Sequence, residues 1–230
     1  MNSLSSKILV WDAPTRVFHW SLALSFIVAF LTGDSERWRD VHVVLGYSMA
    51  GLIGFRMVWG LIGTRYARFR SFSYGPKRIL KYLFSILRGD PKHYPGHNPV
   101  GSLAVYLLLA FGVIVAASGV VVYNDIGGEW LEELHEAMAN AMLVLVLIHI
   151  TGVAASSLLH QENLVWAMVT GMKQGDPAEG ISRRHTWLAV LLVVAVAAFW
   201  IGGIAGPGQT GGEKADLPSV QREAYVWRDR

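Results

Sequence analysis

Four of the eight histidines in this 230-residue chain fall in or beside long apolar segments, and their spacing could support chemistry. They are His19, His42, His135 and His149. Ionisable residues within a membrane span are costly and usually functional. One histidine near a helix end is more often an interfacial residue than a ligand, so the relative positions of the four must decide between these readings.

The elements that position these histidines are expected to be membrane spans. Charged residues make up only 16% of the chain and hydrophobic residues 53%, whereas a soluble domain usually carries about 25% charged residues. The sequence contains long, mostly apolar runs, and such runs predict transmembrane helices. We expect five of them, at about Val17–Thr32, Val41–Ile62, Pro99–Tyr123, Leu134–Leu159 and Thr186–Ile204. No cleavage pattern follows the first run, so we expect a span there and no signal peptide.

The predicted fold class is therefore an all-α integral membrane protein. Residues 1–173 are expected to form a four-helix transmembrane bundle, and residues 174–205 a linker and a fifth C-terminal transmembrane helix. Residues 206–230 would be an extracytoplasmic tail, which either docks a partner or is a disordered end. A membrane-surface amphipathic helix or a plain basic connector fits residues 77–87 equally well.

The charges between the spans predict the orientation. Residues 63–98 carry eight Lys/Arg and one acid, whereas residues 124–133 carry four acids and no base. Basic loops stay in the cytoplasm. We therefore expect a multi-pass protein of the bacterial cytoplasmic (inner) membrane, surrounded by lipid, with a cytoplasmic N-terminus and a periplasmic C-terminus. The net charge of +3 is too small to suggest nucleic acid.

In this topology the four histidines form two pairs at different depths. His42 and His135 lie at the outer starts of their spans, and His19 lies near the inner start of its own. His149 follows His135 by 14 residues, which is roughly 21 Å along a helix and nearly a whole number of turns. His42 and His135 therefore share the outer level, and His19 and His149 the inner level.

Two stacked histidine pairs are what two bis-histidine haems need. Helix bundles build cofactor sites from side chains on facing helices, and haem iron accepts axial histidines. The chain has no cysteine, which excludes covalent c-type attachment and cysteine-ligated iron–sulfur clusters. We therefore expect two haem b groups, with the four histidines as iron ligands and no catalytic residue.

Two arginines are candidates for the haem propionates. Arg56 follows His42 by 14 residues, and Arg16 precedes His19 by three. An arginine at the depth of Arg56 is costly without a partner, and an inner-haem propionate would supply one. The alternative is that Arg56 extends to the membrane interface. Four further histidines lie on the cytoplasmic side, where His160 or His97 could assist a quinone or proton site: His93, His97, His160 and His185.

Several sequence motifs resemble the bacterial di-haem cytochrome b561 family, which is similar to the b-type cytochrome subunits of Ni/Fe hydrogenases. The likeness covers roughly residues 10–173. It comprises Arg16-Val17-Phe18-His19-Trp20, His42-Val43-Val44-Leu45-Gly46-Tyr47, Phe55-Arg56-Met57-Val58-Trp59-Gly60, Gly96-His97-Asn98-Pro99, Leu134-His135-Glu136 through Ala139-Asn140, and His149 before His160-Gln161-Glu162-Asn163-Leu164. The resemblance implies a cytochrome b/b6-like four-helix core, two non-covalent b haems with these four ligands, and electron exchange with the quinone pool. The fifth span fits the family's five-helix members.

Three functions remain open at this point. The favoured one is an electron-transfer subunit of a quinol-linked oxidoreductase in a respiratory chain. It would connect quinone or quinol with an extracytoplasmic partner such as a c-type cytochrome, a hydrogenase or a reductase subunit. A self-contained superoxide:quinone oxidoreductase is the first alternative, although the acidic outer loop disfavours an anionic substrate despite Arg37 and Arg39. A haem-free proton-coupled transporter is the second.

Overall fold

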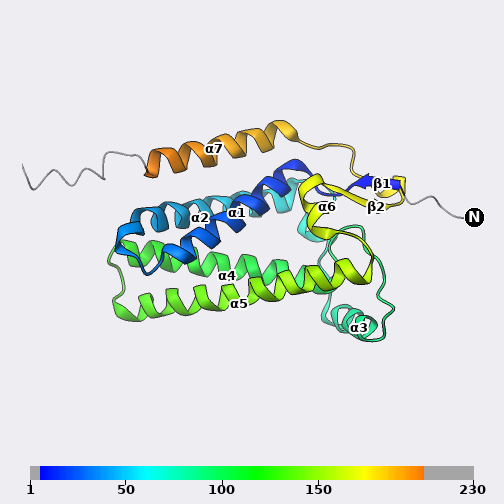
Figure 1. Cartoon of the computed structure of the whole chain (residues 1–230), viewed down its shortest axis with the longest axis horizontal. Helices are drawn as coiled ribbons and strands as arrows, with labels where there is room; N and C mark the ends of the chain where they lie inside the picture. The colour runs from blue at the N-terminus through cyan, green and yellow to red at the C-terminus, as the bar shows by residue number, and fades with distance from the viewer. Residues whose placement is uncertain (1–5, 205–230) are drawn as a thin grey trace, which may run out of the picture.

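The computed structural model describes residues 6–204, and the predicted tail at residues 206–230 lies outside them. Four long helices run side by side as a bundle: α1 (Ala13–Thr32), α2 (Arg39–Ile62), α4 (Pro99–Tyr123) and α5 (Glu129–Leu159). The fifth long helix, α7 (Thr186–Ile204), lies outside the bundle along α1 and α2 (Figure 1). All five are long and apolar enough to cross a membrane. The predicted fold class is confirmed.

Three of the five predicted helix starts need correction, and each has a local cause. Helix α1 begins at Ala13 because the Asp12 side chain caps it, accepting a bond from the Thr15 amide at 2.8 Å. A 3₁₀ turn, η1 (Glu36–Trp38), leads into α2, which starts at Arg39. Helix α5 starts at Glu129 and not near Leu134, since acidic residues in a first turn complement the helix dipole.

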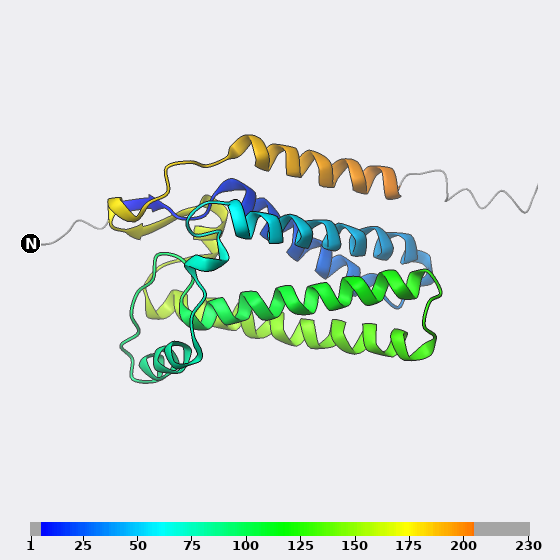
Figure 2. The same ribbon diagram turned by 180° about the vertical axis from the view of Figure 1, so that it is seen from behind.

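The remaining elements gather at one end of the bundle. They are η2 (Phe69–Ser71), α3 (Pro76–Leu87), α6 (Leu164–Thr170), η3 (Pro177–Glu179) and a sheet of β1 (Ser6–Leu9) and β2 (Met172–Gly175). The strands pair antiparallel from Ser6 opposite Gly175 to Leu9 opposite Met172. We call this the basic end. The α1–α2 and α4–α5 connections form the opposite, acidic end (Figure 2).

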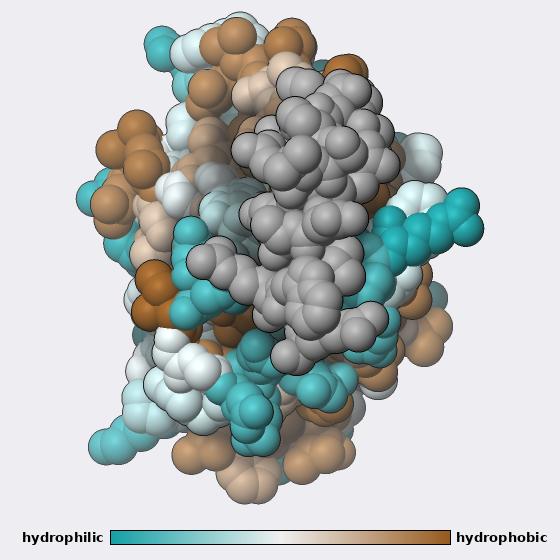
Figure 3. Space-filling view, turned by 90° about the vertical axis from the view of Figure 1, so that its left-hand side faces the viewer, coloured by the Kyte–Doolittle hydropathy of each residue, from teal (hydrophilic) through white to brown (hydrophobic). Residues whose placement is uncertain are grey.

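The two ends differ in how they are built. An ion pair at the basic end joins Lys173 of β2 to Glu162 beyond α5, with nitrogen and oxygen 3.3 Å apart and both side chains buried. Burial lowers the pKa of Lys173, and Glu162 opposes that shift. The view onto the acidic end shows hydrophilic side chains below its centre and at its sides, and apolar side chains mostly toward the outline (Figure 3).

The bundle core consists of two apolar clusters. Phe18, Leu52, Ile53 and Leu109 form one cluster, and Phe26, Met49, Val115 and Met142 form the other. Both clusters contain residues of α1, α2 and α4, and the second also contains Met142 of α5. The core therefore joins these facing helices. Helix α7 adds a hydrogen bond from the Trp200 indole to the Ser48 hydroxyl at 2.8 Å. The division of the chain at residue 173 stays a prediction.

Candidate functional site

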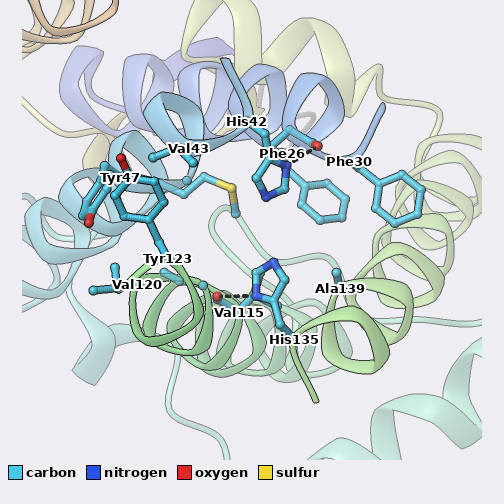
Figure 4. A pocket seen from close by; sticks show the side chains of 15 residues that line it. Phe26, Phe30, His42, Val43, Tyr47, Val115, Val120, Tyr123, His135 and Ala139 are labelled. Atoms are coloured by element: carbon cyan, nitrogen blue, oxygen red, sulfur yellow. Dashed lines mark hydrogen bonds between the residues drawn. The ribbon is translucent and has the colours of Figure 1, made fainter. Parts of the chain in front are cut away.

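Near the acidic end, His42 of α2 and His135 of α5 face each other across a pocket inside the bundle (Figure 4). Their ring centroids are 6.1 Å apart and the ring planes are nearly perpendicular. The structure thus brings together the two histidines that were predicted to share this level. The pocket walls are mostly apolar and include Phe26, Phe30 and Val115, which limits access of water to the ring nitrogens.

Backbone carbonyls fix both rings in the same way. The Nδ1 atom of His42 lies 2.8 Å from the Ala29 carbonyl oxygen, and the Nδ1 atom of His135 lies 3.1 Å from that of Val115. A carbonyl oxygen only accepts, so each Nδ1 carries the proton and each Nε2 keeps a free lone pair. Metal-ligating histidines are commonly oriented by such a bond from the other ring nitrogen. Both rings therefore present an unprotonated Nε2 atom to the pocket between them.

Gly119 of α4 is required where the α4 backbone passes the His135 ring. A Cβ atom at position 119 would lie 2.9 Å from the His135 Cε1 atom, closer than real Cβ contacts allow. The absence of a side chain at Gly119 therefore lets the ring occupy its position between α4 and the pocket. The sequence alone does not tell which group lies against this glycine.

The second pair lies toward the basic end. It consists of His19 of α1 and His149 of α5, and the Nδ1 atom of His19 is buried without a hydrogen-bond partner. Buried polar atoms are nearly always bonded in folded proteins. The unpartnered His19 nitrogen indicates that a further group belongs at this position.

Both predicted arginines lie toward the basic end of the bundle, where Arg56 is close to the charge of Asp12 and Arg16 contacts α6. Arg56 is only 3% exposed, and its guanidinium carbon lies 4.7 Å above the Phe69 ring. Its Nη1 atom is buried without a partner, so Arg56 does not reach water as the alternative reading required. Arg16 donates from Nη1 to the Val169 carbonyl at the end of α6, while its Nε is also unpartnered.

The residues present fit haem. The pair of facing rings supplies two ligating nitrogens, the apolar pocket suits a macrocycle, and unpartnered arginine donors suit its carboxylates. With no cysteine in the chain, the haem would be held without covalent attachment. The fold and site together define a membrane cytochrome of the b type.

The comparison with known families agrees with this class. A family model described as prokaryotic cytochrome b561 matches residues 10–171. The chain belongs to the prokaryotic cytochrome b561 family. A b-type cytochrome carries haem b and transfers electrons, so family membership favours haem over the haem-free transporter.

Curated relatives are b-type cytochromes too. The "Probable Ni/Fe-hydrogenase B-type cytochrome subunit" of Azotobacter chroococcum mcd 1 is 27% identical over 217 positions, covering 73% of this chain and 89% of the relative. The protein of the same description from Bradyrhizobium diazoefficiens is 24% identical and covers 73% and 86%. The "Probable Ni/Fe-hydrogenase 1 B-type cytochrome subunit" of Escherichia coli strain K12 is 25% identical over 143 positions, covering 50% and 60%. No solved structure matches the chain.

The other histidines lie among the loops of the basic end. The His93 and His160 rings are 5.4 Å apart, and His185 packs on Trp59. Burial lowers the pKa of His160, and the neighbouring His93 and Lys173 lower it further against the opposing charge of Glu162. His97 is enclosed by aromatic rings.

Sequence reasoning missed two features that organise the site. Asp12 is fully buried and accepts hydrogen bonds from Trp59 and Thr64, tying the start of α1 to the end of α2. Its position before Ala13-Pro14 is a recognisable N-cap signal. The carbonyls of Ala29 and Val115 could not be found from the sequence, because every residue has a carbonyl and only the fold selects these two.

Proposed function

We propose that the chain binds two haem b groups, one between His42 and His135 and one between His19 and His149. The observation that carries this proposal is the facing pair at the acidic end, whose Nδ1 atoms are both bonded to backbone carbonyls. The second site is supported by the unpartnered His19 nitrogen and the buried guanidinium of Arg56. Arg16 and Arg56 would receive propionates.

The proposed function is transfer of electrons across the membrane between the quinone pool and an extracytoplasmic redox partner. Haem iron, when bound, supplies one-electron exchange between its ferric and ferrous forms. The protein's own residues hold the two sites at different depths of one bundle and surround the outer site with apolar side chains. That arrangement supports stepwise transfer along the bundle axis.

The orientation of the chain follows from its charges. The basic end carries the eight Lys/Arg of residues 63–98 and belongs in the cytoplasm of a bacterium whose inner membrane holds the protein. The acidic end then faces the periplasm. Residues 123–130 are exposed there and include Asp125 and Glu129. This acidic surface would guide a basic partner such as a c-type cytochrome.

A redox enzyme subunit is the second kind of partner. The relatives in Azotobacter and Bradyrhizobium are described as hydrogenase cytochrome subunits, and a hydrogenase or reductase subunit docked at the acidic end would exchange electrons with the His42–His135 site. In that assembly this chain is the membrane electron carrier, and the partner performs the chemistry on its own substrate.

Quinol reduction of the protein in lipid nanodiscs tests the proposed electron path, in which electrons from quinol reach the outer haem through the inner haem. We expect a short-chain quinol to reduce both haems of the wild-type protein without oxygen. In His149→Ala the outer haem should no longer be reduced by quinol, although dithionite should still reduce it. His42→Ala is the matched control, because its inner haem should still accept electrons from quinol. Equal quinol reduction of the outer haem in His149→Ala and wild type would contradict the proposed path, as would a wild-type protein that quinol cannot reduce.

A further inference from the structure

Buried donors without partners are concentrated at the basic end of the bundle. Among the described residues, they include Arg16 Nε, His19 Nδ1, Arg56 Nη1, Arg68 Nε and His97 Nδ1. Donors left unbonded in a protein interior cost free energy, so such a group of them indicates a missing acceptor. His19 belongs to the proposed iron ligands and Arg56 to the proposed propionate contacts, whereas His97 has no role so far.

Aromatic side chains hold the His97 ring in one place. Its centroid lies 4.7 Å from that of Trp11 and 4.4 Å from that of Phe72. The backbone is held as well, because the Tyr74 hydroxyl donates to the His97 carbonyl at 3.2 Å, and the next residue, Asn98, caps α4. The direction of the imidazole nitrogens is therefore set by packing before any ligand binds.

His97 is neutral in this environment. Burial, as the largest cause, and the charges of Arg56, Lys173, His149 and His19, in that order, together lower the pKa of His97 to about 3. A neutral imidazole carries one N–H donor and one acceptor nitrogen.

Arg56 and His97 flank the same aromatic ring. The guanidinium carbon of Arg56 is 5.9 Å from the Phe72 ring centre, and the His97 ring packs on Phe72 at 4.4 Å. The acids nearby already have partners. Asp12 accepts from Thr15, Trp59 and Thr64, and Glu162 pairs with Lys173. No acceptor among the described residues forms a hydrogen bond with Arg56 Nη1 or His97 Nδ1, so a bound group is the candidate acceptor for both.

We propose that His97 and Arg56 together bind one carboxylate of the haem held by His19 and His149. The inference rests on the proposed function, since that haem supplies the carboxylate. Arg56 provides the charge, and His97 provides a neutral donor whose direction is fixed by Trp11 and Phe72. A charge-assisted hydrogen bond is the stronger kind, so even one neutral donor matters to haem retention.

Two substitutions separate hydrogen bonding from packing. His97→Phe keeps a ring against Trp11 and Phe72 and removes the donor, whereas His97→Asn keeps a donor near the position of Nδ1. His93→Phe is the matched control, since His93 is a histidine of the same loop whose side chain is 42% exposed. Each change is made in the His42→Ala background, in which only the inner haem should remain, and haem loss to excess apomyoglobin is followed in detergent.

We expect His97→Phe to lose haem faster by roughly ten- to a hundredfold, the range that a hydrogen bond to a charged group supports. His97→Asn and His93→Phe should stay close to the parent rate. In the full two-haem protein, the propionate bending band in the resonance Raman spectrum should shift in His97→Phe and return in His97→Asn, which gives a result even if the His42→Ala background is unstable.

Three outcomes would overturn the inference. Haem loss and Raman bands in His97→Phe that match the parent would overturn it and leave the two-haem function intact. Equal acceleration in His97→Phe and His97→Asn would assign His97 to packing alone. A full-length protein without an inner haem would remove the proposed function itself, and this inference with it.

Discussion

At the scale of single residues, the protein holds the two histidine pairs in different ways. Both rings of the outer pair are oriented by backbone carbonyls, at 2.8 Å for His42 and 3.1 Å for His135. His19 of the inner pair has a buried Nδ1 without such a partner. The fold itself therefore orients the rings of His42 and His135, whereas no protein group orients His19 through its Nδ1 atom.

Gly119 provides a prediction at this scale. Gly119→Ala would place a Cβ atom 2.9 Å from the His135 Cε1 atom and force the ring to move. We expect a shifted midpoint potential and altered low-spin EPR signal for the outer haem, with the inner haem unchanged. Gly51→Ala is the control, since a Cβ there meets nothing within 4 Å. Unaltered outer-haem signals in Gly119→Ala would show that the ring position is not set by this contact.

Whether the position of a site residue could be predicted from the sequence depended on the chemistry of that residue. The depth and facing of His42 and His135 could be predicted because helix geometry is regular and ionisable residues are rare in spans. The orienting carbonyls of Ala29 and Val115 could not be predicted, since a backbone group has no sequence signature. His97 was visible only as one of several histidines near the basic loops, and its enclosure by Trp11 and Phe72 requires tertiary structure.

At the scale of elements, helix α3 lies across the bundle direction at the basic end, where it is seen nearly end-on (Figure 1). Leu80, Leu83, Phe84 and Leu87 follow helical spacing and are exposed, whereas Tyr82 is buried. An exposed apolar face beside basic residues fits a helix lying in the membrane interface. The structure therefore favours this reading over a plain connector.

Spin labels test the placement of α3. The chain has no cysteine, so Leu83→Cys and Lys81→Cys each create a single labelling site, one on the apolar face and one nearly opposite on the basic face. In liposomes we expect the label at position 83 to be relaxed by oxygen and the label at position 81 by a water-soluble nickel chelate. Equal exposure of both labels to the nickel chelate would place α3 in water.

Long elements were easier to predict than short ones. The bounds of α4 and α7 match the predicted spans because long apolar runs between polar flanks define them. The four-residue strands β1 and β2 were not predicted, since so short a segment has no periodic signal and each strand exists only through the other. Their pairing brings the N-terminal segment against the chain that follows α6.

At the scale of the whole molecule, the core of the bundle could be predicted from the sequence, whereas the basic end could not. The spans, their number and the histidine levels follow from periodicity and hydropathy. The basic end depends on contacts between distant segments, among them Asp12 with Trp59 and Thr64, and Lys173 with Glu162. These contacts close the bundle at its basic end, so the least predictable part of the fold lies beside the proposed inner site.

Haem stoichiometry tests the account most directly. The protein would be purified in mild detergent, and its haem counted by the pyridine haemochrome assay beside oxidised and dithionite-reduced spectra. We predict low-spin b-type bands and two haems per chain, with His42→Ala and His149→Ala each losing a different one. A colourless protein, or a single haem that neither substitution affects, would contradict the assignment of the four histidines.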